Sequence, residues 1–78
     1  MNSEPGDYLL SRNGTAFFKV KKLNSTHITL EYVAYFLNSQ IIKQDELIEE
    51  EYSIYVCEYL KPLPKHLEQQ LLKILIFA

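Results

Sequence analysis

The sequence is poor in the residues that build most small chemical sites. It contains one cysteine, Cys57, so no disulfide can form within the chain and a cysteine-rich zinc site is excluded. It contains only two glycines, which leaves no glycine-rich loop to hold a phosphate. The uninterrupted apolar run 74–78 is far too short to span a membrane. A disulfide scaffold, a phosphate-loop enzyme and a membrane span are therefore not expected.

The chain also has no large excess of positive or negative charge. Eight basic residues stand against ten acidic ones, and the net charge is −2. This balance lacks the strong positive field that drives nonspecific binding to nucleic acid, although a local basic patch can still act alone. The polar segment 1–6 has none of the features of a signal peptide, and the lone cysteine fits a reducing compartment. We therefore expect a cytoplasmic location.

Hydrophobic and aromatic residues are abundant. They make up 47% of the 78 residues, with six tyrosines and four phenylalanines among them. A chain of this length has room for one core, and large side chains must supply most of its stability. We expect a flexible leader at 1–6 and a single small α+β domain at 7–78, with a sheet over 7–60 and a helix over 64–77.

The segment 7–22 has the pattern of a β-hairpin. Two runs of strand-forming residues, 7–12 and 15–22, flank Asn13-Gly14, a dipeptide typical of the type I′ turn. A two-residue turn pairs Leu10 with Phe17 and sorts the side chains onto two faces. One face is uncharged and suits a core: Leu9, Ser11, Ala16, Phe18 and Val20. The other face mixes apolar and cationic residues: Tyr8, Leu10, Arg12, Phe17, Lys19 and Lys21.

The rest of the chain predicts three more strands. The third covers 26–37, with a bulge near Val33-Ala34, and a turn at Asn38-Ser39 leads to a short fourth strand at 40–43. One or two helical turns are expected at 45–51. Residues 53–60 fit both helical spacing and strict alternation, and we favour a fifth strand. The strand count and spacing resemble the SH3-like barrel, a small strongly bent antiparallel sheet; no family motif accompanies this resemblance.

Three readings of the mixed hairpin face remain open. In the first reading, the C-terminal helix covers Leu10 and Phe17, while the lysine stems extend around the rim. Alternatively, the face stays open and binds a protein partner. In the third reading, Tyr8 and Phe17 stack on bases while Arg12, Lys19 and Lys21 contact phosphates.

The C-terminal segment 71–78 is unusually apolar for a helix, with Lys73 as its one charged residue. An apolar surface that nearly encircles a helix must pack on its own sheet or on another chain. We expect Leu71, Leu75 and Phe77 to contact a partner or a second copy, which makes a homodimer through this helix a candidate. Reversible contact with a membrane is less favoured, because only Lys65 and Lys73 are available to meet anionic lipid.

The remaining polar residues predict no reaction centre. The acidic run 45–51 has the composition of a solvated surface, and docking of a basic partner is its functional alternative. Neither His27 nor His66 has a cysteine or carboxylate at a spacing typical of metal ligands. We expect no catalytic residue, metal or cofactor.

The sequence thus predicts a non-enzymatic protein-interaction module, such as a small bacterial or viral regulator or inhibitor. The alternative is a small nucleic-acid-binding barrel that uses the aromatic and basic hairpin face.

Overall fold

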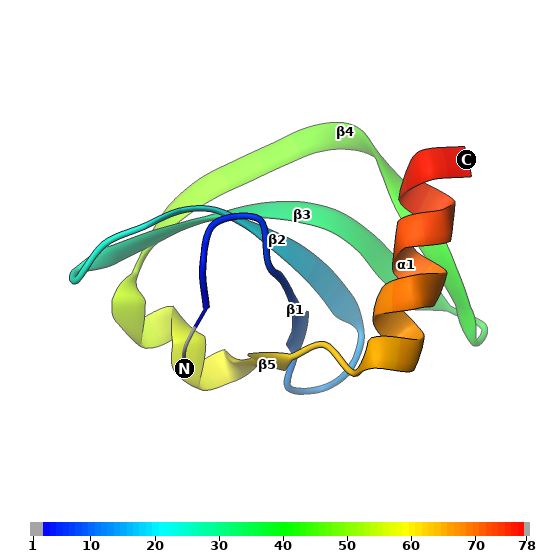
Figure 1. Ribbon diagram of the computed structural model, residues 1–78, viewed down its shortest axis with the longest axis horizontal. Coiled ribbons are helices and arrows are strands. Elements are labelled where there is room, and N and C mark those ends of the chain that lie inside the picture. The colour runs from blue at the N-terminus through cyan, green and yellow to red at the C-terminus, as the bar shows by residue number, and fades with distance from the viewer. Residues whose placement is uncertain (1–2, 78) are drawn as a thin grey trace.

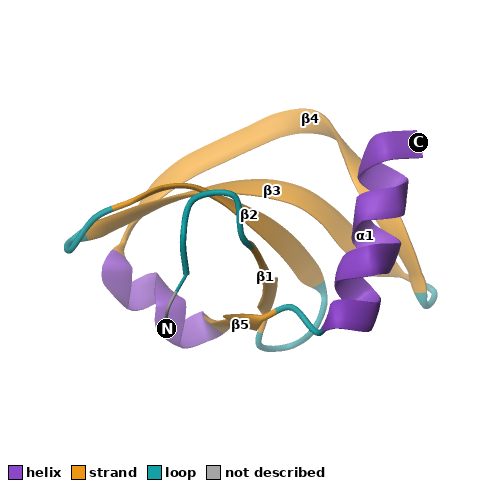
Figure 2. Cartoon of the chain, in the orientation of Figure 1, coloured by secondary structure: helices purple, strands orange, loops and turns teal. Residues whose placement is uncertain are grey.

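A computed structural model describes residues 3–77 as a five-stranded antiparallel sheet with one C-terminal α-helix (Figures 1 and 2). The elements, in chain order, are β1 (Tyr8–Ser11), β2 (Ala16–Leu23), β3 (His27–Leu37), β4 (Gln40–Ser53), the 3₁₀-helix η1 (Ile54–Tyr59), β5 (Leu60–Pro62) and α1 (Lys65–Phe77). The strand order is β4-β3-β2-β1-β5, so the described sheet is open, with β4 and β5 at its edges. The predicted α+β class and the C-terminal helix are confirmed.

The β1–β2 hairpin has the predicted register but a different turn. Tyr8 lies opposite Lys19 and Leu10 opposite Phe17. Gly14 has a φ of +77° and donates its N–H to the Ser11 carbonyl at 2.8 Å, whereas Asn13 has no positive φ. A type I′ turn needs positive φ at both central residues, so that prediction is wrong. The Asn13 side chain instead accepts hydrogen bonds from the backbone and the hydroxyl of Thr15, which closes the loop.

The β3–β4 hairpin contains the turn with two positive φ angles. Asn38 and Ser39 have φ of 51° and 64°, and they join the paired residues Leu37 and Gln40. The predicted bulge near Val33 is confirmed. The register moves from Tyr32 opposite Ile48 to Ala34 opposite Lys43, which leaves one residue of β3 against the four residues 44–47 of β4.

Two predicted elements are wrong. Residues 45–51 are not helical but belong to β4, because the long strand β3 offers them a partner as far as His27 opposite Ser53. Beyond Ser53, β3 has ended and β4 has no strand to pair with. The chain therefore turns into η1, where the Ile54 N–H bonds to the Thr26 carbonyl at 2.9 Å. The fifth strand is not 53–60 but Leu60–Pro62, which pairs with β1.

Each face of the sheet carries its own core cluster. α1 covers one face, and Figure 1 shows it standing against one end of the sheet. The cluster below α1 contains Leu10, Phe17, Val33, Ala34, Ile41, Leu63 and Leu71. The cluster on the other face lies against η1 and contains Leu9, Val20, Ile28, Leu30 and Leu60. Two buried faces explain why both sides of the hairpin are partly apolar.

The end of the segment expected to be a flexible leader makes backbone hydrogen bonds, one of them to the sheet. Asp7 donates its N–H to the Glu4 carbonyl at 3.0 Å, and Gly6 donates to the Val20 carbonyl at 2.7 Å. Met1, Asn2 and Ala78 lie outside the described residues. Between residues 3 and 77, no helix is long and apolar enough to cross a membrane.

Candidate interaction surfaces

The apolar part of the mixed hairpin face is buried. Leu10 is 3% exposed and Phe17 is fully buried, and both pack in the cluster below α1. The ring of Phe17 lies 5.0 Å from that of Phe36, centroid to centroid, at an interplanar angle of 53°. Helix α1 therefore covers the apolar part of the hairpin face, which was a predicted binding surface for a partner protein. Neither Leu10 nor Phe17 is at the surface.

The polar residues of this face are half-buried or exposed, and some of them make side-chain contacts. The Lys19 ammonium lies 5.8 Å from the centroid of the Tyr8 ring, within the range of a cation–π contact. The Lys21 ammonium lies 3.5 Å from a carboxylate oxygen of Glu31. Arg12 is exposed in the β1–β2 turn, apart from this group. The surface offers a small mixed-charge patch rather than a continuous cationic one.

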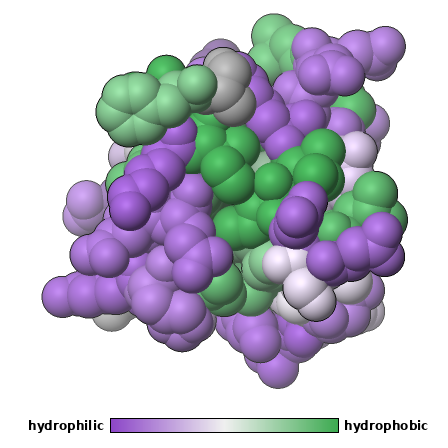
Figure 3. Space-filling view, turned by 90° about the vertical axis from the view of Figure 1, so that its right-hand side faces the viewer, coloured by the Kyte–Doolittle hydropathy of each residue, from purple (hydrophilic) through white to green (hydrophobic). Residues whose placement is uncertain are grey.

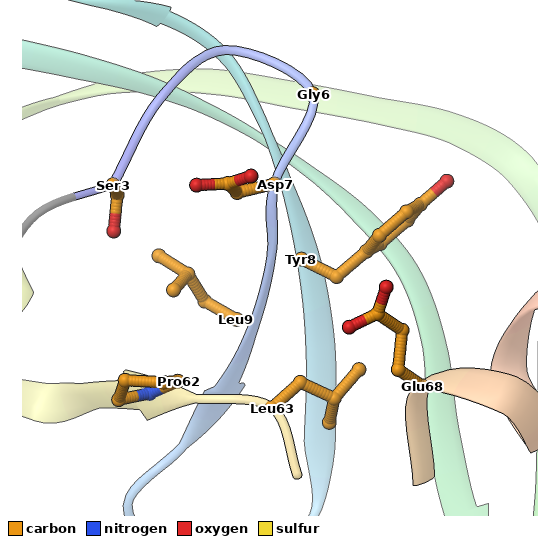
Figure 4. Close-up of a pocket in the computed structure, with 8 residues that line it drawn as sticks. All are labelled: Ser3, Gly6, Asp7, Tyr8, Leu9, Pro62, Leu63 and Glu68. Carbon is orange, nitrogen blue, oxygen red and sulfur yellow. The ribbon is translucent and has the colours of Figure 1, made fainter. Parts of the chain in front are cut away.

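A shallow cavity of about 370 Å³ opens beside Tyr8 (Figure 4). It is lined by Ser3, Gly6, Asp7, Tyr8, Leu9, Pro62, Leu63 and Glu68. Figure 4 shows Tyr8 and Glu68 side by side on one flank of the cavity and Asp7 on the other. Burial, followed by the negative charges of Glu31 and Glu68, raises the pKa of the Tyr8 phenol above its ordinary value.

The groups with catalytic or ligating chemistry are dispersed. Cys57 is half-buried in η1, His27 is exposed at the start of β3, and His66 is exposed in the first turn of α1. The His27 Nδ1 lies 2.9 Å from the Thr26 hydroxyl. Within the described part of the chain, no three His, Cys, Asp or Glu side chains are grouped so that they could hold a metal ion.

The C-terminal end of α1 carries the most exposed large apolar side chains of that helix. Leu71 is fully buried and Leu75 is half-buried, so these two residues serve mainly the chain's own core. Phe77 is 83% exposed and its neighbour Ile76 is 68% exposed. Ile76 was not among the predicted contact residues, although the helical period places it on the side of α1 away from Leu71.

A groove of about 440 Å³ lies between α1 and the start of β4. This α1–β4 groove is lined by Ser39, Gln40, Ile41, Gln70, Lys73 and Ile74. Figure 3 shows that end of the molecule with apolar surface gathered at its centre and hydrophilic atoms around it. An apolar centre with a polar rim is the usual anatomy of a protein-interaction surface.

The acidic residues of 45–51 are exposed along β4. Asp45 and Glu46 lie in the four-residue bulge, and Glu49, Glu50 and Glu51 lie in the half of β4 that pairs regularly with β3. These acids are exposed, as their composition predicts, but they lie on an edge strand and not on the predicted helix.

The chain matches no protein-family model, and no curated protein or solved structure is significantly similar to it.

Proposed function

We propose that this protein is a non-enzymatic interaction module whose main contact surface is the exposed end of α1 together with the α1–β4 groove. The observation that carries the proposal is the exposure of Ile76 and Phe77, at 68% and 83%. Burying a side chain of this kind contributes about 1.5–3 kcal/mol, so two adjacent ones favour a protein surface that covers them. A small bacterial or viral regulator that acts in the cytoplasm fits this size and surface.

The fold fits the same proposal. The strand order, with β5 returning to pair with β1 after a 3₁₀-helix, supports describing the domain as an open form of an SH3-like sheet. Such small sheets are scaffolds that hold an interaction surface rigidly and carry many unrelated functions, so the fold by itself does not name the partner. The nucleic-acid alternative loses one of its two stacking rings, because Phe17 is fully buried.

The proposal is tested by placing a photo-crosslinking residue at position 73, which lines the α1–β4 groove, in the otherwise unchanged full chain and in the variant Ile76→Ser/Phe77→Ser. The matched control is Tyr55→Ser/Tyr59→Ser, which removes two exposed aromatic residues of η1 instead. We expect one specific adduct that the helix variant loses and the control keeps. Light scattering of the pure protein separates a homodimer from a complex with another protein. A monomer without adducts, or adducts that ignore the helix variant, would refute the proposal.

A further inference from the structure

Strand β4 forms the outer edge of the sheet and has a free side. Among residues 3–77 it pairs with β3 alone, and in Figure 1 it runs as the outermost strand along the top of the molecule. From Ile48 opposite Tyr32 to Ser53 opposite His27 the register is uninterrupted. In a regular antiparallel strand, every second residue directs its N–H and C=O away from the existing partner. The stretch 48–53 thus presents unpaired backbone donors and acceptors to the outside.

The two faces of this edge differ in chemistry. Glu49 lies opposite Glu31 and Glu51 opposite Thr29, so both acids stand on one face. The cations on that side all belong to β2, with β3 in between. Lys19 lies opposite Glu31 and Lys22 opposite Thr29, and the Lys21 ammonium pairs with the Glu31 carboxylate. On the other face, Ile48 and Tyr52 are half-buried, while Glu50 between them is exposed. The edge therefore joins a negatively charged face to a partly apolar one.

This pattern disfavours pairing between two copies of the chain. If a second β4 aligned antiparallel about Glu50, Glu49 of each copy would stand opposite Glu51 of the other. Like charges directly opposite each other destabilise a strand pair, and charged edge residues are a common protection against such pairing. The same charges favour a strand of opposite sign.

We propose that β4 accepts an extended basic segment of a partner protein as a sixth strand alongside 48–53. Lysine or arginine at every second position would face Glu49 and Glu51, and β-branched residues between them would extend the apolar face of Ile48 and Tyr52. Main-chain hydrogen bonds supply affinity in this mode of binding, and the alternating side chains supply specificity. The inference rests on the proposed function in that the partner is a protein, but it uses a surface separate from the α1–β4 groove.

The test uses the full chain, labelled with ¹⁵N, and an eight-residue peptide of alternating lysine and threonine. We expect the amide signals of 48–53 to shift on titration and their hydrogen exchange to slow. Raising the salt concentration should weaken binding, because the charges are exposed to solvent. A peptide of alternating glutamate and threonine should not bind.

Two N-methylated peptides separate strand addition from simple charge attraction. One carries methyl groups on the backbone nitrogens of its lysines and the other on those of its threonines, so both keep the full charge. In a strand, all residues whose side chains share a face also direct their N–H groups to the same edge. One of the two methylated peptides should therefore lose binding while the other keeps it. Equal binding by both would overturn the proposal.

Charge-reversal variants locate the site. Glu49→Lys/Glu51→Lys should weaken binding about tenfold, since two exposed attractions become repulsions. The matched control Glu4→Lys/Glu58→Lys changes the net charge equally, at exposed positions outside β4. It should change the logarithm of the dissociation constant of the peptide by less than half as much. Phe77→Ser should leave peptide binding unchanged. If Phe77→Ser abolishes partner adducts while the peptide fails to bind, the groove proposal stands and the edge proposal falls.

Discussion

At the scale of single residues, backbone dihedral angles decide where the chain turns. Asn38 and Ser39 both adopt a positive φ, which ordinary L-residues avoid because Cβ approaches the following carbonyl oxygen. Asn tolerates this conformation better than Ser does, because its short side chain bonds locally to the backbone. Ser39 is therefore the more strained of the two turn residues.

Ser39→Gly should raise the free energy of unfolding by about 0.5–1 kcal/mol. Glycine removes the Cβ strain at φ 64°, and this gain exceeds the extra chain entropy that glycine loses on folding. Urea titration followed by circular dichroism measures the change. The control Ser25→Gly, at a turn residue without positive φ, should be slightly destabilising. Equal effects of the two substitutions would show that strain at residue 39 is unimportant.

At the scale of elements, α1 is held to the sheet by a narrow strip of its surface. Leu71 is fully buried at the centre of that strip, with Leu67, Ile74 and Leu75 half-buried around it. The opposite side of the helix carries Ile76, which contributes little to the chain's own core. Burial, rather than hydrophobicity alone, should decide how much each residue stabilises the fold.

Leu71→Ala should lower the free energy of unfolding by about 3 kcal/mol, because it leaves a cavity in the cluster that contains Phe17 and Ala34. Ile76→Ala, a truncation of similar size at a 68% exposed position, should cost less than about 1 kcal/mol. Chemical denaturation of both variants gives the comparison. Similar losses for the two would mean that α1 is docked by a different face from the one described.

At the scale of the whole molecule, the two clusters share one sheet. Phe17 and Val20 lie on the same strand, but Phe17 packs in the cluster below α1 and Val20 in the cluster against η1. Neither cluster can lose its strands without removing the support of the other. Seventy-eight residues also provide too little buried surface for two independent units.

We therefore predict a single cooperative transition. Val20→Ala and Leu71→Ala should each shift thermal unfolding to lower temperature, and far-UV circular dichroism should coincide with tyrosine fluorescence in both variants. The wild-type chain serves as the reference for coincidence of the two probes. Separate transitions in either variant would show that the clusters unfold as two units, and would contradict the single-domain prediction.

Local patterns were sufficient for the hairpin register, the bulge near Val33 and the boundaries of α1. The alternation around Leu10 and Phe17 and the helical spacing around Leu71 are properties of neighbouring residues, so they can be read from the sequence. The stretch 45–60 could not be read in this way. Ile48 and Tyr52 fit a helix as well as a strand, and only pairing with β3 selects the strand.

The residue pattern is enough to show that the chain has more apolar surface than one sheet face can bury, since both sides of the hairpin are partly apolar. Which part of that surface is covered depends on the packing of the folded chain. α1 packs over Leu10 and Phe17 because its own Leu71 needs burial, and this leaves Ile76 and Phe77 exposed on the other side of the helix. Burial depends on contacts between residues far apart in the chain, which local periodicity does not encode.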